Sequence, residues 1–273
     1  MRYGILGDIH GNLEALTAAL NALDRIDVDR VVCLGDIVGY NADSNACAAL
    51  VQRRGIESIA GNHDLISIGR LTTDKCANKA AFALERTRRV LKPETRSFLS
   101  SLPQTRIYET RLLLIHGGIG DVEQYIYTSE EVRLNVYVLR RCYPQIHVCF
   151  FGHTHEPKVY EVDGDDLVAE LPARGTVPLS DGRRYFINPG SVDAARKRES
   201  RLAEFGVFDS SRRRMEFHQA AYDYLEAEMK AAGEGYRINA DAVTDLFYSA
   251  RRRVVSAWTD CRNALLRARR RSA

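Results

Sequence analysis

Five of the seven histidines in this 273-residue chain lie in short, glycine-containing loops that follow apolar runs. Two of them, His153 and His155, flank one threonine in the stretch FFGHTHEP. Residues two apart in a strand point to the same side, so both rings could face one point at a strand end. The others are His10 in GDIHG, His63 in GNHD and His116 in IHGG. Turns require glycine, asparagine or aspartate but not histidine, so the repeated pattern favours a chemical role over ordinary turns.

Oxygen donors occupy the same loops: Asp8, Asp36, Asn62 and Asp64. Imidazole and carboxylate together suit borderline divalent metals, whereas all-oxygen sites suit calcium or magnesium. The donors are too many for a single tetrahedral zinc ion. They fit two ions bridged by one carboxylate at a separation of about 3.5–4 Å, an arrangement used in phosphoester hydrolysis.

The elements that must position these donors alternate between strand and helix. The runs RYGILG, DRVVCLG and IESIAG predict buried strands, and residues 12–23 and 43–54 predict the helices between them. Such repeats with short links favour parallel pairing and right-handed crossovers. In open α/β sheets, ligands collect at the carboxyl ends of the strands, where these loops would lie.

The rest of the chain is richer in strands. Residues 74–101 predict a helix broken at Pro93, and residues 129–141 predict another. Several strand-like runs follow one another between residues 106 and 220, which indicates two packed sheets with helices outside. After Ala220 only helical patterns remain, so we expect one domain over residues 1–220 and a helical, arginine-rich extension over residues 221–273.

The ordered set D-x-H, GD, GNHD, HG and GHTH resembles the motifs of the calcineurin-like metallophosphoesterase superfamily. The stretches GDIHGNLEAL, GDIVGY and NPGSV further resemble its compact bacterial phosphodiesterase-like branch. The resemblance covers about residues 1–220. It implies a four-layer α/β/β/α sandwich of two mixed sheets with a dimetal site across the strand ends.

The resemblance also implies roles for individual residues. Asp8, His10 and His155 would bind one metal; Asn62, His116 and His153 would bind the second. Asp36 would bridge the two ions.

The implied mechanism is in-line attack on phosphorus by a hydroxide that bridges the metals. His63 would orient the phosphate and protonate the leaving alkoxide. Asp64 would orient His63, or would instead support a metal ligand.

Four residues are weaker candidates for substrate contact. Asn12 could cap the first helix or lie near phosphate. Asn188, Gly190 and Ser191 could form a tight turn or hold an anion through their amides.

Two departures from the family pattern bear on the substrate, namely Glu156 after GHTH and the basic run at residues 196–198. That run could approach a nucleotide phosphate, although a solvated loop is the simpler interpretation.

The extension differs in charge from the rest of the chain. Between Leu246 and Ala273, eight arginines against one aspartate give +7, which leaves −4 for the remainder of a chain whose net charge is +3. Apolar residues recur at helical spacing from Val243 to Ala268, a stripe that would pack on the domain or on a second subunit. The basic face could bind nucleic acid or an anionic membrane. Aromatic residues do not alternate with the arginines as in a platform for single-stranded nucleic acid, so nucleic acid is not favoured.

Composition narrows the function further. No apolar run is long enough for a transmembrane helix, and the N-terminus lacks the pattern of a secretory signal. The six cysteines form no CxxC pair, which indicates reduced thiols and a cytoplasmic location.

The sequence therefore predicts a hydrolase of small phosphoesters, of the phosphodiester or nucleotide type, with two divalent ions such as manganese, iron, zinc or nickel. The alternatives are a serine/threonine-type protein phosphatase or phosphomonoesterase and a non-catalytic scaffold.

Overall fold

The computed structural model describes residues 1–164, 167–193 and 201–237. The described part of the chain contains two six-stranded sheets and seven helices. The strands are β1 (Arg2–Leu6), β2 (Arg30–Cys33), β3 (Glu57–Ser58), β4 (Arg106–Tyr108), β5 (Leu112–Leu114), β6 (Val148–Phe150), β7 (Lys158–Asp163), β8 (Leu167–Leu171), β9 (Thr176–Pro178), β10 (Arg184–Asn188), β11 (Ala203–Asp209) and β12 (Arg214–Ala220). The helices are α1 (Leu13–Ile26), α2 (Ser44–Arg53), α3 (Asn62–Ser67), α4 (Asn78–Val90), α5 (Pro93–Ser101), α6 (Ser129–Cys142) and α7 (Tyr224–Gly233).

Both sheets are mixed. The first has the order β3-β2-β1-β11-β12-β9, and the second has the order β4-β5-β6-β10-β7-β8. The pairs β1–β2, β2–β3, β5–β6 and β6–β10 are parallel, and the other pairs are antiparallel. The parallel strands of each sheet therefore bring their carboxyl ends to one edge.

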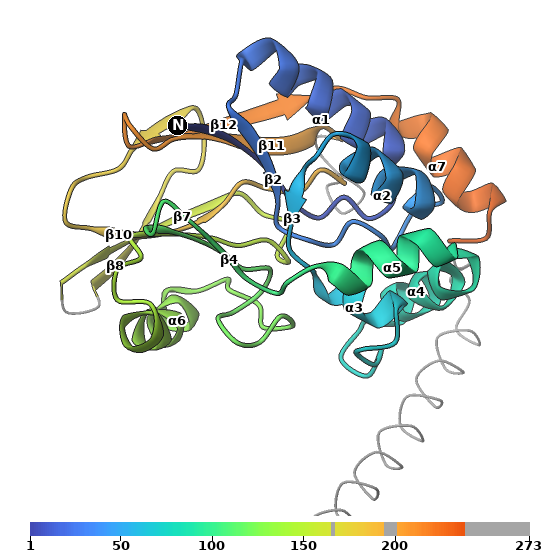
Figure 1. Ribbon diagram of the computed structural model, residues 1–273, viewed down its shortest axis with the longest axis horizontal. Helices are drawn as coiled ribbons and strands as arrows, with labels where there is room; N and C mark the ends of the chain where they lie inside the picture. Colours follow the sequence, from blue (N-terminus) through green and yellow to red (C-terminus); the bar gives the residue numbers. More distant parts are fainter. Residues whose placement is uncertain (165–166, 194–200, 238–273) are drawn as a thin grey trace, which may run out of the picture.

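Side-chain alternation along the strands separates three apolar layers. In β1, Ile5 joins the cluster between the sheets, whereas the next residue, Leu6, joins the cluster under α1 and α2. In β10, Tyr185 faces the first sheet, and Phe186 faces α6 on the outside of the second. The layers are thus helix, sheet, sheet and helix, the expected four-layer sandwich (Figure 1).

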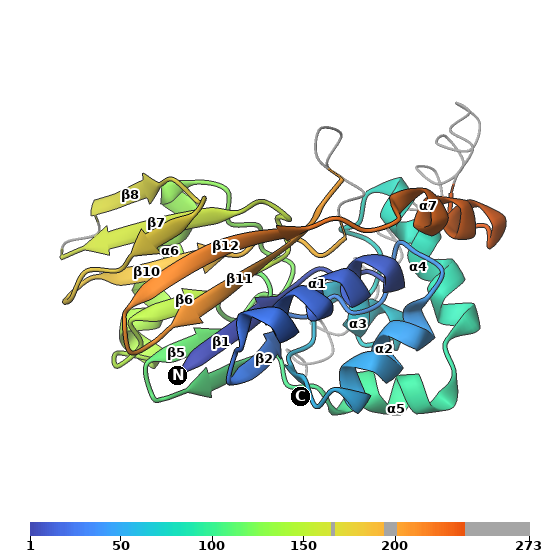
Figure 2. The same cartoon turned by 90° about the horizontal axis from the view of Figure 1, so that it is seen from above.

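Helix α1 shows how local sequence sets these layers. The Asn12 side chain accepts a hydrogen bond from the Ala15 amide and caps the helix, which confirms the capping interpretation. Its apolar positions, including Leu16 and Leu20, are buried on the first sheet. Figure 2 shows α1 lying over the strands of that sheet, with α3, α4 and α5 gathered at one end of the molecule.

The structure differs from the sequence-based prediction at two elements. The GNHD stretch was expected to be a loop, but Asn62 begins α3 directly after Gly61, with Asp64 accepting from the Gly61 amide. Strand β9 was not anticipated, because Thr176–Pro178 is only three residues long and contains a proline at the sheet edge.

Two other predictions lie outside the described residues: the basic run at 196–198 and the helix expected over 241–270. Among the described helices, none has the length and apolar character needed to cross a bilayer. The domain boundary at residue 220 and the cytoplasmic location stay predictions.

Candidate metal centre

The predicted metal ligands come together at one edge of the sandwich. Asp8 and His10 follow β1, Asp36 follows β2, and Asn62 follows β3, while His116, His153 and His155 follow β5 and β6 of the facing sheet. All seven side chains are buried, with no more than 6% of any residue exposed. Seven buried polar side chains in one place are costly without a partner such as a metal.

The backbone at this edge is strained. Asp8, His10, Asp36, His153 and His155 all have φ between +51° and +66°, the left-handed region that residues with a Cβ rarely adopt. Each such residue costs on the order of 1–3 kcal/mol, and such strain concentrates at functional sites. The left-handed turns direct donors from different strands toward a common point.

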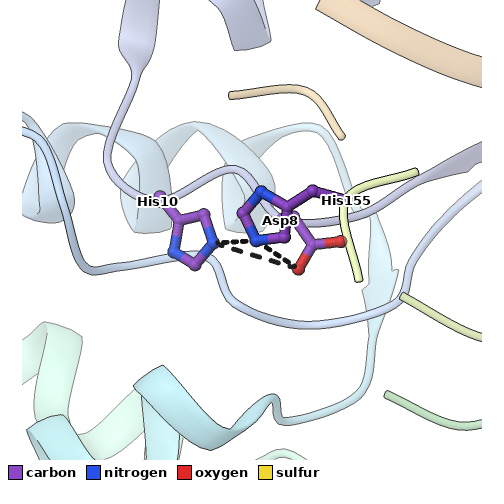
Figure 3. Close-up of side chains that lie close together, drawn as sticks. All are labelled: Asp8, His10 and His155. Atoms are coloured by element: carbon purple, nitrogen blue, oxygen red, sulfur yellow. Dashed lines mark hydrogen bonds and ion pairs between the residues drawn. The ribbon is translucent and has the colours of Figure 1, made fainter. Parts of the chain in front are cut away.

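Asp8, His10 and His155 form the first donor group (Figure 3). His10 Nε2 lies 3.0 Å from His155 Nε2, and His155 Nε2 lies 3.4 Å from Asp8 Oδ1. The Asp8 carboxylate also accepts hydrogen bonds from the His153 amide, at 3.1 Å to each oxygen. One carboxylate therefore fixes the loop that carries both histidines of GHTH.

Asp36, His116 and His153 form a second donor group. His116 Nε2 lies 3.0 Å from Asn62 Oδ1, so the asparagine belongs to the same group. The other ring nitrogen, Nδ1, lies 2.8 Å from the Leu34 carbonyl oxygen. If Nδ1 carries the proton, the lone pair of Nε2 faces the centre and is available to a metal ion.

Asp36 connects the two groups. Its Oδ2 atom lies 3.3 Å from His116 Nε2 and 3.7 Å from His10 Nε2, one from each group. Its Oδ1 atom accepts a hydrogen bond of 2.8 Å from the His63 amide. One carboxylate oxygen therefore lies near a ring nitrogen of each donor group.

The electrostatics favour the ligand forms of two of these side chains. Burial would raise the pKa of Asp36, but the nearby His116 and His63 rings hold it well below the usual value. Burial, together with the adjacent His116, lowers the pKa of His153 to about 3, so its ring is neutral. Burial would also lower the pKa of His116, but the Asp36 carboxylate raises it to about 9. An ionised carboxylate among imidazoles fits borderline divalent ions.

His63 lies over the donors rather than among the two groups just described. Its ring is 4.5 Å from that of His10, centre to centre, and it lines the cavity described below. It can also form a third donor group with His10 and Asp36. Gly39 permits this packing, because a Cβ there would lie 2.5 Å from His63 Nδ1.

Asp64 accepts hydrogen bonds from backbone amides, and the expected orientation of His63 by Asp64 stays a prediction. One carboxylate oxygen accepts hydrogen bonds from the amides of Ile37 and Val38, and the other accepts from Gly61. Burial and the neighbouring Asp36 charge raise the pKa of Asp64 to about 7. The residue thus supports the loop that carries Asp36, which agrees with the alternative role of supporting a ligand.

The four candidate substrate contacts are also supports. Asn12 donates to Asp193 Oδ1, and the Ser191 hydroxyl donates to the backbone carbonyl oxygen of Asp8. Asn188 donates to the Gly152 carbonyl oxygen and accepts from the Gly190 amide. All four are buried and none is among the residues of the cavity wall described next, so their contact with substrate stays a prediction.

A cavity of about 710 Å³ opens directly on the centre and includes Asp36, Asn62, His63, His153 and His155 in its wall. Sequence reasoning missed the residues that shape its other walls. They include Tyr40, Lys75, Lys79, Glu123, Tyr125, Glu228, Tyr236 and Arg237. Among them, only Tyr40 lies in a stretch that carries the family resemblance, GDIVGY.

The chain is similar in sequence to known proteins. A sequence model of the calcineurin-like phosphoesterase superfamily domain matches residues 1–213. An uncharacterised protein of Methanocaldococcus jannaschii is 32% identical over 229 residues, which are 83% of this chain and 90% of the relative.

Two solved structures extend the comparison. A metallophosphoesterase from Sphaerobacter thermophilus is 32% identical, with a TM-score of 0.72 over 92% of this chain and 98% of that one. A Pyrococcus horikoshii protein is 17% identical, with a TM-score of 0.67 over 86% of this chain and 94% of that one, and shares the fold. The family uses dimetal centres, and the buried groups described above are residues that could bind metal. The chain belongs to the calcineurin-like phosphoesterase superfamily.

Proposed function

We propose that this protein hydrolyses small phosphoesters, of the phosphodiester or nucleotide type, with two divalent metal ions. The observation that carries the proposal is the position of Asp36 between two buried donor groups. Five of the donor residues, including Asp36 itself, adopt the strained left-handed backbone conformation. A purely structural role for these side chains would not require that strain.

The proposed ligands follow from the two groups. Asp8, His10 and His155 would hold one ion; Asn62, His116 and His153 would hold the other, and Asp36 would hold both. Two bound ions would supply Lewis acidity, which activates water near neutral pH and offsets charge that develops during phosphoryl transfer. The donor types leave manganese, iron, zinc and nickel as candidates.

His63 is the proposed acid. Its backbone is fixed by the hydrogen bond to Asp36, and its ring faces the cavity. From there it would orient a phosphate oxygen and donate a proton to the departing alkoxide. A positioned acid of this kind contributes about 10²–10⁴ in rate.

The cavity supports a substrate larger than inorganic phosphate. A volume of about 710 Å³ lies within the range typical of sites for small organic ligands. Its wall combines aromatic side chains, including Tyr40 and Tyr125, with the cationic Lys79. A diester with two organic groups, or a nucleotide, fits this combination of apolar and charged wall.

The test is metal-dependent turnover of bis-p-nitrophenyl phosphate and of p-nitrophenyl phosphate by the manganese-loaded protein. We expect turnover of the diester to exceed that of the monoester, and Asp36→Asn to abolish both. Asp24→Asn is the matched control, because Asp24 is exposed and pairs with Arg54 far from the centre. A monoester preference would favour the phosphatase alternative. No turnover of either ester by metal-replete protein would refute an enzymatic role and leave the scaffold alternative.

A further inference from the structure

The segment that follows β12 lies beyond the 1–213 family match, yet it reaches the catalytic cavity. Helix α7 lies beside α1 (Figure 2). The Lys230 ammonium of α7 pairs with Glu14 of α1 and lies 3.1 Å from the carboxylate of Asp43, just before α2. These ion pairs attach α7 to α1 and to the residue that precedes α2.

The contacts of Arg237, four residues after α7, lead toward the centre. Its Nη1 atom donates to the Tyr40 carbonyl oxygen at 2.9 Å, and its Nη2 atom donates to Asn41 Oδ1 at 2.9 Å. The same guanidinium bonds both carboxylate oxygens of Glu228, through Nε at 3.0 Å and Nη2 at 2.9 Å. The planar Arg237 guanidinium is thus fixed by Glu228 of α7, and it bonds in turn to the loop at residues 40–41.

That loop touches both His10 and His63. The Asn41 amide donates to the His10 carbonyl oxygen at 2.9 Å, and Asn41 Nδ2 donates to the same oxygen at 3.2 Å. The Tyr40 ring packs against the rings of His10 and His63, each at 4.7 Å between centres. A displacement of residues 40–41 would therefore move a proposed metal ligand and the proposed acid together.

We propose that Arg237 is a positioning residue of the active site, which holds Tyr40 and Asn41 so that the His10 and His63 rings keep their places. The inference rests on the proposed function for the role of these two rings. It assigns to the segment after the family domain a part in metal binding and turnover. Glu228 holds the guanidinium in the orientation that this requires.

The test compares Arg237→Ala and Arg237→Lys with the matched control Arg86→Ala in the full chain. Arg86 pairs at 3.4 Å with Glu234 of the same segment but is not part of the described cavity wall. Three quantities are measured: manganese affinity by calorimetry, the thermal midpoint in a chelator, and kcat and KM for bis-p-nitrophenyl phosphate.

We expect Arg237→Ala to fold, to bind one manganese ion about tenfold more weakly and to lose kcat by a similar factor. Arg237→Lys should recover part of the thermal midpoint through its charge, but not the metal affinity, because an ammonium cannot bond three partners in one plane. Arg86→Ala should bind metal and turn over substrate like the wild type.

Wild-type metal affinity and kcat in a folded Arg237→Ala variant would overturn the inference, and so would a lower thermal midpoint as the sole effect. If that variant does not fold, Glu228→Gln provides the test. We expect it to lose manganese affinity and kcat by a smaller factor than Arg237→Ala would. Unchanged affinity and kcat in Glu228→Gln would contradict the inference. Absence of turnover in the wild type would refute the proposed function but not this inference. The manganese affinities of the variants would still show whether Arg237 positions His10.

Discussion

Gly39 is a position where a single methyl group should damage the centre directly, because its added Cβ would meet two of the rings. A Cβ there would lie 2.5 Å from His63 Nδ1 and 2.9 Å from His10 Nδ1, whereas ordinary contacts begin near 3.4 Å. Gly39→Ala therefore requires the two rings to retreat by about 0.9 Å and 0.5 Å, and displacements of about 1 Å at a reacting centre cost roughly 100-fold in rate.

The same change has a cost in stability. Gly39 has a φ of +144°, where an alanine is strained by about 1–3 kcal/mol. Overpacking against the two rings adds about 1–3 kcal/mol. Both costs reduce the free energy of unfolding, which urea denaturation of the metal-free protein measures.

The control is Gly55→Ala. Gly55 also has a positive φ, +62°, but no atom lies within 4 Å of its added Cβ. It should lose about 1–2 kcal/mol of stability through backbone strain and keep full turnover. If folded Gly39→Ala protein hydrolyses bis-p-nitrophenyl phosphate within twofold of the wild-type kcat, the packing of these rings has no catalytic importance and the reasoning is refuted.

Three further predictions concern the support, the acid and the metals. Asp64→Asn should lower the free energy of unfolding by about 1–3 kcal/mol, because an amide nitrogen would face the Gly61 amide; unchanged urea denaturation would contradict the supporting role. His63→Ala should lower kcat far more for an alkyl phosphodiester than for a p-nitrophenyl ester, since the poorer leaving group needs the proton, and equal losses would exclude the acid role. Manganese at about 1,000 times its dissociation constant should stabilise chelator-treated protein by about 4 kcal/mol for each bound ion in the same assay, and a midpoint independent of manganese would mean that no such site exists.

Much of the fold was predictable because its signals are local. The apolar face of α1, the Asn12 cap and the break at Pro93 each determine structure within a few residues. The two-sheet sandwich followed from the order of strands and helices along the chain. The start of α3 at Asn62 was missed, because glycine, asparagine and aspartate indicate turns equally well.

The site was predictable in part for a similar reason. Its donors lie in recognisable loops at strand ends, so their types and order indicate a shared centre. The supporting roles of Asp64, Asn188 and Ser191 depend on which distant amide or carbonyl group lies beside each side chain. The same holds for Arg237, whose partners Tyr40 and Asn41 are nearly 200 residues away in the sequence. Contacts between residues so far apart in the sequence produce no local motif or periodicity, so the sequence alone does not predict them.

The central claim is that two metal ions share one carboxylate, and metal stoichiometry tests it most directly. Calorimetric titration of chelator-treated protein with manganese, checked by elemental analysis, should give two ions per wild-type chain. His153→Ala should retain the ion assigned to Asp8, His10 and His155 and weaken the other. A wild-type protein that saturates with one ion, or binds none, would contradict the account.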